Sequence, residues 1–113
     1  SGPTMTVYGR RFMNSTTYKI KYLPLAVQDL KGIAQYLSGF YPNTASRVLH
    51  ELQKKITQLN NMPERYEVYP FDTFYRKMVV DQYLVFYHIN DRTHAVEIHR
   101  ILRGSWNLPQ YLG

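Results

Sequence analysis

Apolar residues follow two different periods along the chain, and the change of period divides it into a helical part and a strand-forming part. Residues 18–23 alternate apolar and basic side chains, which is typical of a half-buried strand. Pro24 ends this strand and suits the first turn of a helix, because the N–H that proline lacks is not needed there. Two apolar stripes at helical spacing follow, from Ala26 to Leu37 and from Ala45 to Leu59. The sequence therefore predicts two amphipathic helices joined by a short loop.

From about residue 74 onward the apolar period becomes two. Residues 74–80, 83–89 and 95–102 are rich in β-branched and aromatic side chains, and turn-forming residues separate them at 81–82 and 90–93. The predicted order of elements is β-α-α-β-β-β. Helices grouped before a run of strands favour an α+β fold, in which an antiparallel sheet carries the N-terminal helical hairpin on one face.

Length and composition bound the class of protein. A chain of 113 residues with 44% hydrophobic residues can form one domain with its own core. We interpret residues 1–17 as a cloning remnant (Ser1 to Thr4) followed by a flexible N-terminal extension, and residues 18–113 as a single domain. The chain has no cysteine, which excludes disulfides and thiolate metal sites and suits a reducing cytoplasm. It has neither an apolar run long enough to span a membrane nor a signal peptide, so we expect a cytoplasmic protein without a membrane partner.

The positive charge is concentrated in the first half of the chain. The formal net charge is +6; residues 1–59 hold eight basic and two acidic residues, whereas residues 60–113 hold six of each. Because the field around a protein follows the local excess of charge, the helical half is the expected docking surface for an acidic partner. The alternative is a basic helix pair that is only solvated.

Four segments, in order and with matching spacing, carry a resemblance to a known family. They are Tyr18-x-Ile20 with Pro24-x-Ala26-x-x-Asp29-Leu30-x-x-Ile33-x-x-Tyr36; Ile56-x-x-Leu59-x-x-x-Pro63; Arg76 with the run Tyr83 to Ile89; and Val96-x-Ile98-x-Arg100 continuing through Gly104 to Leu108. With these segments the chain resembles the RelE/ParE superfamily of toxins over about residues 18–112. The resemblance implies the toxic half of a bacterial type II toxin–antitoxin pair. Its chief partner would be a cognate antitoxin that folds on binding, and operator DNA would be contacted only through that antitoxin.

The resemblance leaves three functions open. The branch of the superfamily that cleaves mRNA on the ribosome places two lysines on the strand before the hairpin turn and an arginine on the next strand. Here that strand offers Arg76 and Lys77, which point to opposite faces, and Leu84 stands at the arginine position. The terminal motif is most similar to the ParE-like branch, which is associated with poisoning DNA gyrase. We therefore expect a ParE-like gyrase inhibitor, with a ribosome-dependent mRNA endonuclease and a non-toxic binding or corepressor module as alternatives.

Candidate site residues follow from these alternatives. An mRNA endonuclease needs groups that take and give a proton and cations that stabilise the charged phosphorane. If the chain is such an enzyme, the catalytic candidates are Arg76, His99, Arg100, Arg103 and Tyr111. The candidates for binding the target or the antitoxin are Lys31, Arg47, Lys54, Lys55, Arg76, Tyr87 and Trp106.

Several of these candidates also have structural interpretations. Arg100 falls among the apolar positions of its strand, which predicts either a β-bulge or an ion pair with a carboxylate. Arg76 has Asp72 or Asp81 as expected ion-pair partners, and Tyr87 can belong to the core. The histidines at positions 88, 94 and 99 do not have the spacing of a metal site, so we expect neither a metal nor a cofactor.

Overall fold

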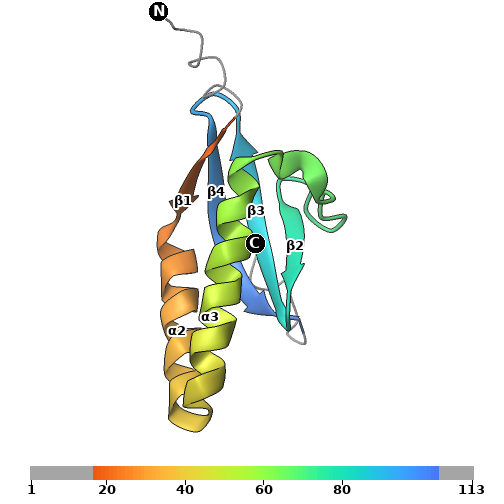
Figure 1. Cartoon of the computed structure of the whole chain (residues 1–113). Coiled ribbons are helices and arrows are strands. Elements are labelled where there is room, and N and C mark those ends of the chain that lie inside the picture. Colours follow the sequence, from red (N-terminus) through yellow and green to blue (C-terminus); the bar gives the residue numbers. More distant parts are fainter. Residues whose placement is uncertain (1–16, 105–113) are drawn as a thin grey trace, which may run out of the picture.

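A computed structural model describes residues 17–104 of the chain. Strand β1 (Lys19–Tyr22) leads into helix α2 (Pro24–Phe40) and helix α3 (Pro42–Thr57). Two single-turn 3-10 helices, η2 (Gln58–Asn60) and η3 (Pro63–Arg65), follow α3. The chain then forms β2 (Arg76–Val80), β3 (Tyr83–Asn90) and β4 (Ala95–Arg103) (Figure 1). The predicted order of helices and strands is confirmed.

The four strands form one mixed sheet. Their order across the sheet is β1-β4-β3-β2, with antiparallel pairing of β2 with β3 and of β3 with β4. β1 pairs with β4 in parallel, so the expectation of an antiparallel sheet holds for three strands only. The reason lies in the number of chain reversals. α2 continues in the direction of β1, α3 returns, and the strands β2, β3 and β4 alternate after it, so that β4 runs in the same direction as β1 (Figure 1).

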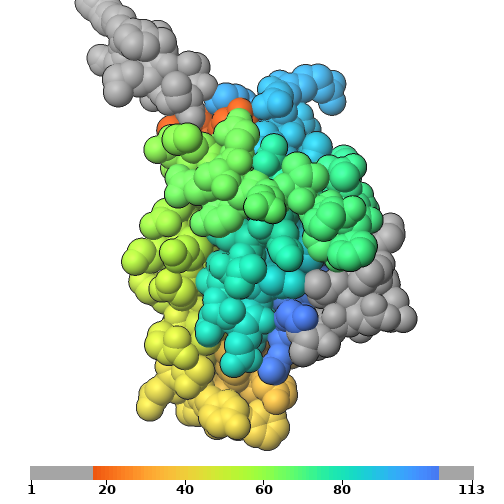
Figure 2. Space-filling view, turned by 90° about the vertical axis from the view of Figure 1, so that its right-hand side faces the viewer, coloured from red at the N-terminus to blue at the C-terminus, as the bar shows by residue number. Residues whose placement is uncertain are grey.

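Both helices cover one face of the sheet, and the main core lies between them. The buried side of the helices consists of Ala26, Leu37, Ala45, Val48, Leu52 and Ile56. They pack in one cluster with sheet residues that include Met78, Val85, Tyr87, Val96 and Ile98. Figure 2 gives a second view, in which the helical hairpin reaches beyond the end of the sheet. The predicted α+β architecture, with the hairpin on one face, is confirmed.

The opposite face of the sheet has a smaller cluster of its own. Phe86 and Leu102 are buried there together with Tyr69 from the loop between η3 and β2, and Tyr75 and Leu84 pack against them. Aromatic pairs hold this loop to the sheet; the Tyr69 ring meets the Phe86 ring at 5.0 Å between centroids. Within residues 17–104, no helix combines the length and the apolar character needed to cross a membrane.

Candidate functional site

An aromatic and histidine cluster occupies the sheet face opposite the helices. The ring of Phe74 stacks on the imidazole of His88, with centroids 4.0 Å apart and planes inclined by 10°. His99 meets the edges of Phe74 and Tyr75 at 5.6 and 5.1 Å. The two imidazoles lie 6.5 Å apart. We call Phe74, Tyr75, His88 and His99 the histidine cluster.

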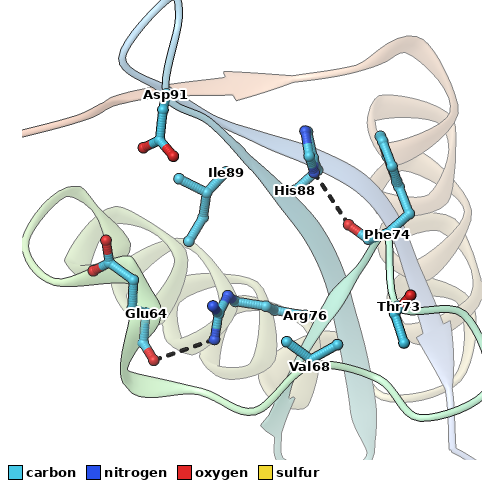
Figure 3. A pocket seen from close by; sticks show the side chains of 8 residues that line it. All are labelled: Glu64, Val68, Thr73, Phe74, Arg76, His88, Ile89 and Asp91. Carbon is cyan, nitrogen blue, oxygen red and sulfur yellow. Dashed lines mark hydrogen bonds between the residues drawn. The ribbon is translucent and has the colours of Figure 1, made fainter.

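His88 is fixed in one orientation by the loop that covers it. Its Nδ1 lies 3.1 Å from the carbonyl oxygen of Phe74 (Figure 3). A carbonyl only accepts hydrogen bonds, so Nδ1 carries the hydrogen of this contact. His88 is therefore oriented by the backbone of the residue whose ring stacks on it.

His99 has a nitrogen that no neighbour satisfies among the described residues. Its Nε2 is buried without a hydrogen-bond partner, and the nearest carboxylate oxygen, on Glu97, is 3.8 Å away. Burial lowers the pKa of His99, and nearby His88 lowers it further, whereas Glu97 opposes the shift. The imidazole is thus neutral near pH 7 and is able to accept a proton.

Arg100 is held in a structural ion pair. Its Nε and a terminal nitrogen donate to the two carboxylate oxygens of Asp29 on α2, at 2.8 and 3.0 Å. The same carboxylate accepts the backbone N–H of Ile101 at 2.9 Å. The register of β4 shifts at this point, because Phe86 faces Arg100 while Tyr87 faces Ile98. Both expectations for Arg100, the bulge and the ion pair, are confirmed.

The bulge explains why the Arg100 side chain does not point to the apolar, helix-covered face of β4. Cross-strand partners point to the same face, and Phe86 packs in the cluster opposite the helices. The bulge leaves His99 as an extra residue, so that Arg100 shares the face of Phe86 while Ile98 and Ile101 still pack toward the helices. A guanidinium bound to a carboxylate through two nitrogens in this way is held in place by the fold.

Arg76 lines a pocket at the edge of the sheet. It is the first residue of β2, and the end of β3 extends past this point without pairing to β2. Its guanidinium donates to the carbonyl oxygen of Tyr66 at 2.7 Å. It also donates to the carbonyl oxygen of Glu64 at 3.3 Å (Figure 3). The expected ion pairs with Asp72 or Asp81 are not formed; loop carbonyls take their place. The side chains of Glu64 and Asp91 also line the pocket, so two carboxylates accompany the one guanidinium and disfavour a phosphate there.

The catalytic candidates do not come together. Arg103 donates to the side chain of Gln82 at 3.1 Å and pairs across the sheet with Tyr83, whose ring belongs to the core under the helices. His99 and Arg100 lie on the other face, and Arg76 lies in the edge pocket. The fifth candidate, Tyr111, is outside the described residues. Arg76 and Lys77 point to opposite faces as predicted, since they face Tyr87 and Phe86 respectively.

The binding candidates divide into accessible and inaccessible residues. Lys31, Arg47 and Lys54 are exposed on the helices, Lys55 is half-buried, and none of the four is ion-paired within residues 17–104. Tyr87 is fully buried, and its hydroxyl donates to the carbonyl oxygen of Pro63 at 2.6 Å. Burial also raises the pKa of Tyr87, so the hydroxyl keeps its proton. The structure thus contradicts a binding role for Tyr87, because no partner can reach it. Trp106 lies outside the described residues.

Sequence reasoning missed two features of the site. Asp29 was recognised only as part of a helix motif, although it binds Arg100 from 71 positions away. The stacking of Phe74 on His88 was also missed, because it depends on how the loop before β2 folds back. No group of three or more histidine, aspartate or glutamate side chains suited to a metal ion is found within the described part of the chain.

Comparisons with known proteins identify the family. Residues 20–108 match the family model described as the ParE toxin of the type II toxin–antitoxin system parDE. No curated protein matches the chain.

Solved structures with a similar fold include two from toxin–antitoxin systems. One is from the chromosomal ParDE toxin–antitoxin system of P. aeruginosa, with a TM-score of 0.68 and 15% identity over 78% of this chain and 97% of that one. The other is from the toxin–antitoxin complex RelBE2 of Mycobacterium tuberculosis, with a TM-score of 0.56 and 18% identity over 77% of this chain and 98% of that one. The family match covers most of the sequence, and the fold agrees with it. The chain therefore belongs to the ParE toxin family of type II toxin–antitoxin systems.

Proposed function

We propose that this chain is a toxin that inhibits DNA gyrase by protein–protein contact, without chemistry of its own, and that a cognate antitoxin neutralises it. The observation that carries the proposal is the ion pair of Arg100 with Asp29. Arg100 directly follows His99 in β4 and is one of the cations that an mRNA endonuclease would need, yet its guanidinium binds a carboxylate through two nitrogens. Freeing it for a phosphate would leave Asp29 partly buried and unpaired, which is costly.

The distribution of the other candidate residues supports the same conclusion. A phosphorane needs several cations within hydrogen-bond distance of one centre. Arg76 is bound to loop carbonyls beside two carboxylates, and Arg103 faces the helix side of the sheet. The chain thus offers a ParE-family fold without a convergent set of cations among residues 17–104.

One experiment separates the two main functions. Purified toxin is added to a gyrase supercoiling assay and, in parallel, to translating ribosomes whose mRNA is then examined by primer extension. Inhibited supercoiling or double-strand breaks with intact mRNA is the expected result. Cuts in the mRNA at codon intervals, with gyrase unaffected, would refute the proposal.

A ribosome-dependent mRNA endonuclease is the second candidate, and the histidine cluster is the observation that favours it. His99 is neutral with an unpartnered Nε2, so it can act as a general base, and the neighbouring Phe74 is 51% exposed, so a nucleotide base can stack on it. Replacement His99→Gln tests this role. The variant should lose mRNA cleavage if the second candidate is correct, and it should inhibit gyrase as well as the original chain if the first is correct.

A further inference from the structure

Three exposed aromatic residues gather at the turn between the two helices. Tyr36, Phe40 and Tyr41 expose 53%, 67% and 58% of their surface. Tyr36 and Phe40 are one helical turn apart, with ring centroids at 5.2 Å, and the rings of Phe40 and Tyr41 are 6.3 Å apart. We call these three residues the aromatic tip. They form one contiguous surface rather than scattered apolar positions.

The aromatic tip lies away from the histidine cluster and projects from the molecule. The turn between α2 and α3 forms the lower end of the molecule in both views, beyond the end of the sheet (Figures 1 and 2). Large apolar side chains that pack against no core add little to stability, and small proteins rarely expose several of them side by side without a partner. The core between helices and sheet does not explain why these positions are aromatic.

A groove continues from the aromatic tip onto the sheet. Tyr36 lines it together with Ile33, Tyr83, Ile101 and Arg103, and its volume is about 370 Å³. Gly32 also lines this groove, and nothing lies within 4 Å of the position its Cβ would take. The surface thus consists of a projecting knob beside a mostly apolar depression with one arginine at its border.

The charge around the aromatic tip is positive. Between Asp29 and Glu51 the chain carries Lys31 and Arg47 and no acidic residue. At 1.5 Å per residue, Arg47 and Lys31 lie within about 15 Å of the tip along their helices. A partner that buries the rings would therefore gain from acidic residues around its own apolar surface.

The geometry favours a protein over a nucleic acid as this partner. Bases stack on open, parallel ring faces, but the rings of the tip are inclined to each other by 49° and 43° and so form a compact knob. Tight binding to a phosphate backbone also needs more cations than this region holds. Clustered tyrosine and phenylalanine beside an arginine are instead typical of the central residues of protein interfaces.

We propose that the aromatic tip is the surface by which this toxin binds its protein target, inserting Phe40 and Tyr41 into an apolar hollow with an acidic rim. This inference rests on the proposed function, in which the toxin acts by protein–protein contact. The inference goes beyond the proposed function because it assigns target recognition to the end of the helical hairpin and not to the sheet.

The test uses a double replacement, Phe40→Ser with Tyr41→Ser. Both side chains are exposed, and Tyr41 is the N-cap residue of α3 with no side-chain capping bond, a position that serine favours, so the fold should be retained. Phe71→Ser is the matched control, because Phe71 is 78% exposed but lies in the loop before β2. Arg47→Glu is a second, independent variant that reverses a charge near the tip. Circular dichroism verifies the fold of each protein.

Each variant is measured for growth arrest on induced expression and for inhibition of gyrase supercoiling. The double replacement should abolish growth arrest and raise the concentration for half-inhibition of gyrase at least about tenfold, as expected for central interface aromatics. Arg47→Glu should weaken both activities, and Phe71→Ser should retain both.

Several outcomes would overturn the inference. One is a double variant that arrests growth as well as the original chain; another is a Phe71→Ser variant that loses activity equally. A double variant that remains toxic but is no longer neutralised by co-expressed antitoxin would assign the tip to the antitoxin instead. Loss of binding to plasmid DNA in a gel-shift assay would assign it to nucleic acid.

The proposed target and the proposed binding surface can be refuted independently. If the original chain arrests growth without affecting gyrase, the proposed target is wrong, and the growth assay of the double variant still decides the role of the tip. An original chain that arrests no growth overturns both proposals.

Discussion

The ion pair between Arg100 and Asp29 allows the sharpest prediction of stability. Replacement Asp29→Ala removes the two carboxylate oxygens that accept from the guanidinium, one of which also accepts the Ile101 N–H. The two side chains are only 17% and 13% exposed, so water compensates little of the loss. Breaking a fully buried pair costs about 3–5 kcal/mol, and an unsatisfied buried N–H costs about 1–3 kcal/mol. Because some solvent reaches the pair, we expect the free energy of unfolding to fall by about 2–4 kcal/mol.

This loss is measured by urea unfolding followed by circular dichroism. It corresponds to a decrease in Tm on the order of 10 °C or more for a domain of this size. Asp29→Asn keeps one carbonyl oxygen and should lose about half as much. Glu67→Ala is the control, since Glu67 is exposed and its side chain has no ion pair within the described residues; it should stay within about 0.5 kcal/mol.

A double-mutant cycle decides whether the stability comes from the pair itself. Asp29→Ala, Arg100→Ala and the double replacement should give a coupling energy above about 1 kcal/mol. A coupling energy near zero would mean that each residue contributes independently. That result would refute the conclusion that Arg100 is committed to the fold and would reopen its role in catalysis.

Three further predictions concern single residues of the core, the histidine cluster and α2. Tyr87→Phe removes the buried hydroxyl bonded to Pro63 and should lower the free energy of unfolding by about 1–2 kcal/mol in urea; an unchanged value would contradict the hydrogen bond. The pKa of His99 is lowered in the folded state, so the unfolded chain binds more protons below its ordinary value of 6.5. The free energy of unfolding should therefore fall as the pH drops through that value, and His99→Gln should reduce this dependence; an equal dependence in the variant would contradict it. Gly32→Ala should raise the free energy of unfolding by about 0.5–1 kcal/mol, because the helix gains a better former and the added Cβ meets nothing within 4 Å; a decrease would indicate that α2 needs the glycine.

The sequence predicts local structure well because local structure depends on local patterns. The elements can be predicted from the apolar stripes of α2 and α3 and from the alternation in β3 and β4. The placement of Arg100 at an apolar position also indicates an irregularity in β4. The parallel pairing of β1 could not be predicted in this way, since alternation identifies a strand but not its neighbour.

The candidate site is less predictable because its contacts come from segments far apart in the chain. Arg76 illustrates this difficulty. Nearby carboxylates at positions 72 and 81 suggested an ion pair, but the guanidinium binds carbonyls 10 and 12 residues earlier, which the loop after α3 brings close. Tyr87 was expected either to bind a partner or to belong to the core, and its position in a central strand buries it entirely. Composition does not reveal which polar group a loop will present.

The central position of β4 has a consequence for the synthesis of the toxin. β4 pairs on one side with β1 and on the other with β3, and it is the last strand of the described chain. A nascent chain that ends before residue 95 can form the helical hairpin and the β2–β3 pair, but its first strand has no neighbour to join. Contacts so distant in sequence form late, after the local ones. The toxin therefore completes its sheet only after the residues of β4 have been synthesised, and the edges of β1 and β3 remain open to capture by another strand until then.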